Sequence, residues 1–329
     1  MIDDDMTRRS FLRRLGAAVA TAAATGALPR TAAAEPADRA APGRVRFGVQ
    51  TPPQHTTWAE IERVWVDADG LDLDSAFVFD HFMPIFSDPE GPCLEGWMLL
   101  AALAAKTTRI RAGVLVTGNT YRNPALLAKM AATVDHVSRG RLILGMGAGW
   151  FEREHEAYDV PFHDTGERAR RLVEAVTVVK KLFSEERADF DGRYYTLADA
   201  PFEPKPVQRP HPPILIGGMG PKVIQPLAAR EADIWHFFVR SGDPAEARTI
   251  CARFDAICRE VGRDPAAVEK STSIRAEQLA GEGVGKTRDH VRALVDAGVR
   301  HVILSLPPPY DRDLLRAFAE EIAPAVRAA

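Results

Sequence analysis

The stretch AFVFDHF at residues 76–82 is the first indication of the fold. Its first four residues form a short, continuously apolar run, which is typical of a strand buried on both faces of a parallel sheet. The polar pair Asp80 and His81 follows at the carboxyl end of that strand. Because active sites of parallel barrels form at this end of the strands, the stretch predicts both a strand and the rim of a site.

Similar apolar runs recur along the chain and alternate with helix signals. Thr57 and Glu60 form a capping box at one helix start, and Gly140 stands where a left-handed helix C-cap belongs. We expect strands at residues 45–50, 76–79, 110–116, 142–146, 214–216, 233–237, 270–274 and 301–304. Eight strand–helix units with right-handed crossovers close naturally into a barrel.

The predicted fold class is therefore α/β, a (β/α)8 TIM-type barrel over residues 45–329 with an insertion after strand 4. The insertion is expected as a hairpin at residues 188–197, with Asp191 and Gly192 at its turn. A barrel needs roughly 250 residues, which fits this chain once the N-terminus is set aside. An open doubly wound sheet is the competing arrangement.

Residues 1–34 are predicted to be an export signal, and residues 35–44 a linker. Paired arginines at Arg8 and Arg9, a mildly apolar stretch from Leu15 to Leu28 and the small residues 32–34 are typical of the twin-arginine type. We expect cleavage after Ala34, export to the periplasm or cell envelope, and cofactor loading in the cytoplasm. The alternatives are an amphipathic presequence or a disordered tail. A stable membrane span in the mature protein is not expected, because the apolar stretch is short.

Composition narrows the classes of partner. The chain is 46% apolar, and its formal net charge is −3. This mild acidity disfavours nucleic acid as a partner, because its phosphates require a basic surface.

The three cysteines, Cys93, Cys251 and Cys258, form neither a disulfide framework nor a metal-binding spacing, so no metal site is expected. Cys251 and Cys258 are expected on one face of a buried helix.

Polar and glycine-rich segments follow several predicted strands and should meet at one rim. The imidazole of His81 can move a proton in either direction. The glycines Gly217, Gly218 and Gly220, with Pro221 as the first helical residue, predict an anion site made of backbone amides, with a tight structural turn as the alternative.

A third glycine-rich segment, GMGAGW at residues 145–150, resembles a dinucleotide fingerprint only superficially. Its sixth position is Trp150, and no acidic strand end follows about twenty residues later. We interpret Gly147 and Gly149 instead as residues that make room for a flat ring.

Six motifs occur in an order that resembles the luciferase-like monooxygenase superfamily, and more narrowly its actinobacterial deazaflavin-dependent oxidoreductases. They are QTPPQ at 50–54, FDHF at 79–82, YRNPA at 121–125, GRLILG at 140–145, GAGW at 147–150 and IGG at 216–218. The resemblance covers about residues 45–305. It implies an enzyme that binds coenzyme F420 (8-hydroxy-5-deazaflavin) or, alternatively, FMN.

The resemblance also implies roles for individual residues. His81 corresponds to the histidine next to the cofactor ring, and a non-proline cis peptide behind the ring corresponds to Gly113 and Val114. The remaining expected cofactor contacts are Asp80, Thr117, Asn119, Gly147, Gly149, Gly217, Gly218 and Gly220. The sugar-phosphate dehydrogenases of this family carry Glu where Trp150 stands here and Trp where Ile85 stands. We therefore expect Ile85 and Trp150 to line a more apolar substrate pocket.

Three functions remain open at this point. The first is hydride transfer between coenzyme F420 and an organic, fairly apolar small molecule, such as an envelope lipid or a polyketide-like compound, with His81 moving the balancing proton. The second is an FMN-dependent monooxygenase that uses O2. The third is a non-catalytic carrier of a cofactor or ligand. The expected partners are the small-molecule substrate, the twin-arginine translocation machinery and a second copy in a homodimer.

Overall fold

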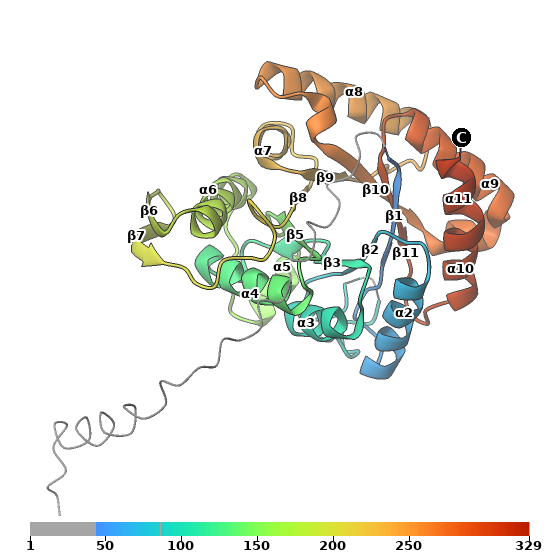
Figure 1. The fold of residues 1–329 in the computed structure, drawn as a ribbon, viewed down its shortest axis with the longest axis horizontal. Coiled ribbons are helices and arrows are strands. Elements are labelled where there is room, and N and C mark those ends of the chain that lie inside the picture. The colour runs from blue at the N-terminus through green and yellow to red at the C-terminus, as the bar shows by residue number, and fades with distance from the viewer. Residues whose placement is uncertain (1–43, 86, 329) are drawn as a thin grey trace, which may run out of the picture. The chain divides into compact units, whose positions relative to one another are not determined.

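The computed structural model describes residues 44–85 and 87–328, and these residues form a barrel of parallel strands surrounded by helices (Figure 1). The predicted signal at residues 1–34 and most of the predicted linker lie outside the described residues. The barrel strands are β1 (Arg46–Gln50), β2 (Ser75–Val78), β3 (Arg111–Val114), β4 (Thr117–Gly118), β5 (Leu142–Gly147), β8 (Ile214–Gly217), β9 (Ile234–Phe237), β10 (Glu269–Arg275) and β11 (His301–Ser305).

The sheet closes on itself. Its order is β3-β2-β1-β11-β10-β9-β8-β5-β4, and a further parallel pairing of β3 with β5 completes the ring. Strands β3 and β4 are two pieces of one barrel position, and both pair with β5. The predicted barrel is confirmed, and the open sheet is excluded, because the pairing of β3 with β5 gives each of the eight barrel positions a neighbour on both sides.

Helices cover the outside of the barrel (Figure 1). They are α2 (Trp58–Gly70), α3 (Gly96–Lys106), α4 (Pro124–Val137), α5 (Glu152–Ala157), α6 (Thr165–Ser184), α7 (Ile224–Glu231), α8 (Pro244–Glu260), α9 (Ala276–Asp296), α10 (Arg312–Arg316) and α11 (Ala323–Arg327), with short η1 (Pro265–Ala267) and η2 (Ala317–Ile322). The capping box of Thr57 and Glu60 is confirmed at the start of α2. Gly140 adopts φ 83° after α4, as predicted, and Cys251 and Cys258 are both buried on α8.

The insertion after the fourth barrel position is the hairpin of β6 (Arg187–Asp191) and β7 (Thr196–Pro201). The amide of Gly192 donates to the carbonyl of Tyr195 at 3.0 Å, which closes the turn where it was expected. The hairpin packs against α6, on the outside of the barrel (Figure 1).

Large side chains fill the barrel interior, so the barrel is a packed core rather than a pore. A cluster separate from the outer core consists of Phe77, Leu115, Ile143, Leu215, Ile234 and Ile303. Gly113 belongs to this packing, because a Cβ there would lie 2.8 Å from the Phe77 ring and 2.7 Å from the Ile143 carbonyl oxygen. The glycine therefore allows strand and ring to approach each other closely.

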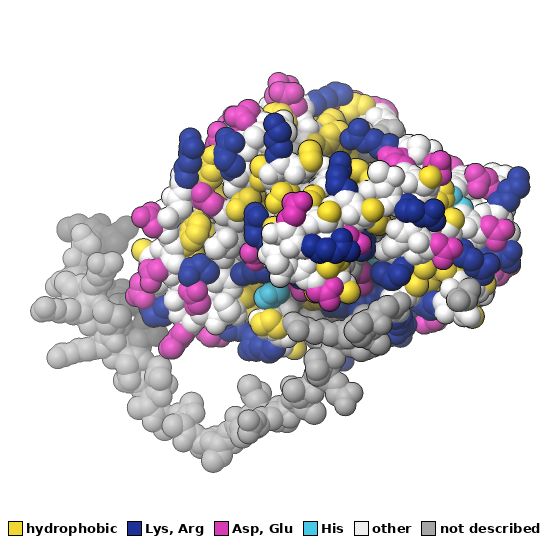
Figure 2. Space-filling model, turned by 90° about the horizontal axis from the view of Figure 1, so that it is seen from above, with side chains coloured by type: hydrophobic (Ala, Val, Ile, Leu, Met, Phe, Trp, Pro, Cys, Tyr) yellow, Lys and Arg dark blue, Asp and Glu magenta, His cyan; other side chains and the backbone are white. Residues whose placement is uncertain are grey.

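The described surface mixes charges of both signs. On the face seen in Figure 2, basic and acidic side chains alternate among apolar ones, in keeping with the small net charge of −3. None of the helices in residues 44–85 and 87–328 combines the length and the apolar character that a bilayer span requires.

Candidate active site

His81 lies at the carboxyl end of β2, on the rim where the sequence analysis placed it. Its Nδ1 is 2.9 Å from Oε2 of Glu154. Its Nε2 has no hydrogen-bond partner among the described residues, and the side chain keeps 9% of its surface exposed. One ring nitrogen is thus fixed by the protein, whereas the other is available to a ligand.

Glu154, on α5, holds this end of the site together. Its side chain is fully buried, and it accepts hydrogen bonds from His81, from the Tyr121 hydroxyl and from the amides of Phe82 and Met83. Burial by itself would raise the pKa of the Glu154 carboxyl. The hydrogen bonds from His81, Tyr121 and Phe82 outweigh burial, so that pKa lies below its usual value.

Aromatic rings surround the His81 imidazole. The rings of Phe79, Trp150 and Phe151 pack edge-on to it, with centroids 5.1, 5.8 and 6.0 Å away. Trp150 is 56% exposed, so it lies beside His81 and also presents a free apolar face to solvent. Ile85, predicted with Trp150 as a pocket residue, is half-buried, and its amide donates to Gln54.

Asp80 is also completely buried, but it points toward Arg122. The two guanidinium nitrogens of Arg122 donate to its two oxygens at 2.6 and 3.0 Å, and the Thr117 hydroxyl donates to one of them. Trp97 in turn donates to the Thr117 oxygen at 2.9 Å. In this structure both side chains are hydrogen-bonded to other protein groups. The predicted contacts of Asp80 and Thr117 with a cofactor remain predictions.

The cis peptide was predicted at the wrong position. It joins Leu115 and Val116, not Gly113 and Val114. Residues up to Val114 pair regularly with β2, and the amide of Leu115 still bonds the carbonyl of Val78 at 2.8 Å. The regular ladder therefore extends past Gly113 and Val114, and both are buried in the barrel wall.

Val116, which follows this bond, explains two of the rim glycines. A Cβ on Gly147 would lie 2.7 Å from a Val116 methyl group, and one on Gly217 would lie 3.0 Å from it. These glycines make room for the Val116 side chain in the described structure. Gly149 has φ 78°, where a Cβ would meet the Thr120 hydroxyl.

The junction after β8 has unpaired backbone amides, but not every glycine predicted for the anion site contributes one. Gly218, with φ 127°, donates its amide to the carbonyl of His236 at 3.1 Å. The amides of Met219, Gly220 and Lys222 have no acceptor within the described chain. The Lys222 ammonium, which is exposed, has no partner there either.

The helix after this junction also begins later than predicted. Pro221 lies in a turn, and α7 starts at Ile224, because Val223 has φ −131° and ψ −50°, outside the helical region. Since all barrel strands are parallel, the junction and His81 nevertheless lie on the same rim.

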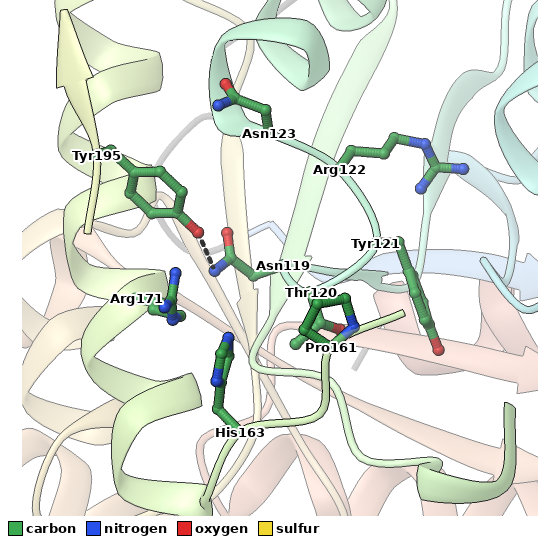
Figure 3. A pocket seen from close by; sticks show the side chains of 9 residues that line it. All are labelled: Asn119, Thr120, Tyr121, Arg122, Asn123, Pro161, His163, Arg171 and Tyr195. Atoms are coloured by element: carbon green, nitrogen blue, oxygen red, sulfur yellow. Dashed lines mark hydrogen bonds between the residues drawn. The ribbon is translucent and has the colours of Figure 1, made fainter. Parts of the chain in front are cut away.

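A pocket of about 210 Å³ adjoins the rim beneath the loop after β4 (Figure 3). Asn119 is almost fully buried there and donates to the Tyr195 hydroxyl at 3.2 Å, while its Oδ1 has no partner in the described structure. His163 and Arg171 lie beside this pair, and both also contact Glu167. The pocket thus brings polar groups of the rim, α6 and the hairpin together.

His236 lies on β9, four barrel positions from β2 and hence on the opposite side of the ring. Its Nδ1 contacts the Ser271 hydroxyl at 2.7 Å. Burial, and to a lesser extent His301, lowers the pKa of His236 to about 3. It is therefore a neutral histidine of the barrel interior, next to the exposed ring of Phe238.

Glu154, Tyr121 and Arg122 are site residues that were not predicted from the sequence. Glu154 lies in the charged run EREHE at residues 152–156, which is typical of an exposed helix. The available signal was the motif YRNPA, which contains Tyr121 and Arg122 but had been used only to support the resemblance.

Comparison with protein families gives a match to luciferase-like monooxygenases over residues 38–323. The chain belongs to the luciferase-like monooxygenase family. His81 and the junction after β8 therefore lie within a luciferase-like barrel.

Two curated relatives of this luciferase-like chain are named F420-dependent glucose-6-phosphate dehydrogenases. The protein of Kineococcus radiotolerans is 40% identical over 51% of this chain and 49% of its own length. That of Microbacterium testaceum is 27% identical over 86% of this chain and 98% of its own length. The chain thus spans about half of the first relative and nearly all of the second.

A solved structure shares the fold. An F420-dependent secondary alcohol dehydrogenase, in complex with an F420–acetone adduct, superposes with a TM-score of 0.76 at 22% identity, covering 86% of this chain and 99% of the other. This likeness supports the luciferase-like barrel described above.

Proposed function

We propose that this protein is an oxidoreductase that transfers a hydride between coenzyme F420 and an organic, fairly apolar small molecule. The observation that carries the proposal is the environment of His81: its Nδ1 is held by a buried carboxylate, while Nε2 is unpaired at the catalytic end of the barrel. The relatives named as F420-dependent dehydrogenases favour this cofactor.

The residues present fit an anionic cofactor. The unpaired amides of Met219, Gly220 and Lys222, with the Lys222 ammonium, would hold its phosphate at the rim. Bound there, the deazaflavin supplies a carbon that accepts or donates hydride. His81 would accept or donate the accompanying proton at Nε2, and the rings around it would limit the access of water.

We propose a substrate that is more apolar than a sugar phosphate. Trp150 presents an exposed indole next to His81, where the resemblance implies a glutamate in sugar-phosphate dehydrogenases. An indole contributes apolar area and offers one N–H donor, but it cannot accept hydrogen bonds from sugar hydroxyls.

The deciding experiment is to incubate purified protein with coenzyme F420 or with FMN, to remove the unbound coenzyme, and to record the absorbance spectrum of the protein. We expect a deazaflavin band and F420-dependent turnover of alcohols or ketones. A two-band flavin spectrum with oxygen consumption would favour the monooxygenase instead. Tight binding without turnover of a broad substrate panel would favour a carrier, and binding of neither coenzyme would overturn both enzyme functions.

We also propose that residues 1–34 direct twin-arginine export, which delivers the folded, cofactor-loaded protein to the envelope. The paired arginines and the small-residue site at 32–34 support this. Fractionation of cells that express the full chain and its Arg8→Lys/Arg9→Lys variant tests it: export should be lost in the variant. An uncleaved wild-type chain confined to the cytoplasm would contradict it.

A homodimer is proposed from the resemblance alone, and light scattering would test it.

A further inference from the structure

We propose that Glu154 is a positioning residue that fixes the tautomer of His81, with Tyr121 orienting Glu154 for this task. The proposal rests on the proposed function only for the role of His81 as the carrier of a proton. The fixed tautomer itself follows from the contacts around the ring.

The first step is the chemistry of the two partners. An ionised carboxylate can only accept hydrogen bonds, so a neutral imidazole in contact with it must carry its hydrogen on the nitrogen that faces it. Nδ1 of His81 faces Glu154 at 2.9 Å. The pKa of Glu154 is lowered, which keeps the carboxylate ionised at neutral pH. The neutral ring therefore bears its lone pair on Nε2.

The second step is the rigidity of the carboxylate. One oxygen accepts from the amides of Phe82 and Met83, which tie it to the backbone directly after His81. The other accepts from His81 and from the Tyr121 hydroxyl. With donors on both oxygens, Glu154 cannot rotate away without leaving buried donors unpaired, which is costly.

The third step is the absence of a competitor. Within the described residues, the imidazole otherwise meets the rings of Phe79, Trp150 and Phe151 and the Tyr121 hydroxyl. The Cys93 thiol contacts the backbone oxygens of His81 and Leu94 and not the imidazole. In the part of the chain that the structure describes, no second carboxylate contacts the ring, so Glu154 determines which nitrogen carries the hydrogen.

The consequence is that the resting enzyme favours one direction of the reaction. A lone pair on Nε2 would accept the proton of a substrate hydroxyl, while the hydrogen on the carbon that bears this hydroxyl would leave as hydride, so that a carbonyl forms. The substrate would lose two electrons to the bound coenzyme, and the proton would reside on His81. Glu154 then balances the charge of the imidazolium. The resting state is thus prepared for oxidation of a hydroxyl-bearing substrate.

The test is 15N NMR of histidine-labelled full-length protein, in which the chemical shifts of the two ring nitrogens report the tautomer. The His81→Asn variant assigns the signal among the nine histidines. We expect wild-type His81 to carry its hydrogen on Nδ1. In Glu154→Gln, the amide oxygen must serve the two backbone donors, so the NH2 group faces Nδ1 and the hydrogen should move to Nε2.

Turnover should fall roughly 10²-fold in Glu154→Gln, whereas coenzyme affinity should stay unchanged. Glu154→Asp, which keeps the carboxylate, should recover part of the lost turnover. Glu152→Gln is the matched control, because Glu152 is exposed on the same helix; it should change neither tautomer nor turnover. Thermal melting checks that each variant folds. A wild-type ring with hydrogen on Nε2, or a folded Glu154→Gln variant with unaltered tautomer and turnover, would overturn the proposal. The NMR readout requires no coenzyme, so it decides the tautomer even if F420 turnover is never found.

Discussion

Oε2 of Glu154 lies 2.9 Å from Nδ1 of His81, although the two residues are 73 positions apart in the sequence. His81 follows β2 and Glu154 lies in the first turn of α5, the short helix after β5, and the closed barrel brings the two segments together. This contact connects the fold to the chemistry, because it leaves one defined nitrogen of the imidazole at the rim.

Replacing His81 with Ala should reduce F420-dependent turnover by roughly 10²-fold or more, because the proton carrier is removed. Coenzyme affinity should change little, since the proposed phosphate contacts lie across the rim after β8. Steady-state kinetics and a binding titration measure the two effects separately. Unchanged turnover would reduce His81 to a packing residue.

Lys222→Glu should weaken coenzyme F420 binding by roughly tenfold, because it reverses the unpaired charge beside the free amides. The defect should shrink as salt is added, since exposed charges are screened. Lys286→Glu supplies a matched control on α9, where the lysine is likewise exposed. Equal losses in both variants would show that net charge, rather than a local site, governs binding.

Gly147→Ala should destabilise the fold by about 1–3 kcal/mol, because the new methyl group would meet Val116 at 2.7 Å. The double variant Gly147→Ala/Val116→Ala should recover much of the loss. Urea unfolding of the two single variants and the double variant measures this coupling. Simple additivity of the two effects would indicate that the side chains do not meet.

Acidification should destabilise the protein through His236. Its pKa is about 3 in the folded chain against a usual value of 6.5, so the unfolded chain takes up a proton first as the pH falls. The stability contributed by the neutral ring is full above pH 6.5 and is lost on the way to pH 3. This single group accounts for about 2 kcal/mol between pH 7 and pH 4.5.

The check is urea unfolding at both pH values for the wild type and for His236→Gln, which cannot titrate. The wild type should lose more stability than the variant by about that amount. An identical loss in both would mean that His236 is protonated, or reached by water, in the folded state.

The sequence predicted the barrel well because buried parallel strands are uniformly apolar and leave a clear pattern. It also located the rim, since His81 directly follows such a strand. Glu154 was not predictable in the same way, because the donors of Tyr121 and Phe82 that compensate for its burial come from distant segments of the sequence. The error of two residues in the cis bond had a similar cause, because the length of a strand ladder depends on its neighbours.

The start of α7 shows the limit of local rules. Pro221 has the properties of a first helical residue, yet the helix begins at Ile224. The carbonyls of Gly218 and Met219 are taken by Trp235 and Gln225, which hold the junction open as a turn. The amides of Met219, Gly220 and Lys222 thus stay free for the proposed anion site.

The β6–β7 hairpin contributes Tyr195 to the pocket around Asn119, although it contributes no strand to the barrel. A segment that the barrel does not need for closure thus forms one wall of a cavity at its entrance. A change in the length or sequence of this hairpin would therefore reshape that wall of the cavity, while the His81–Glu154 contact and the barrel strands beneath it stay as they are.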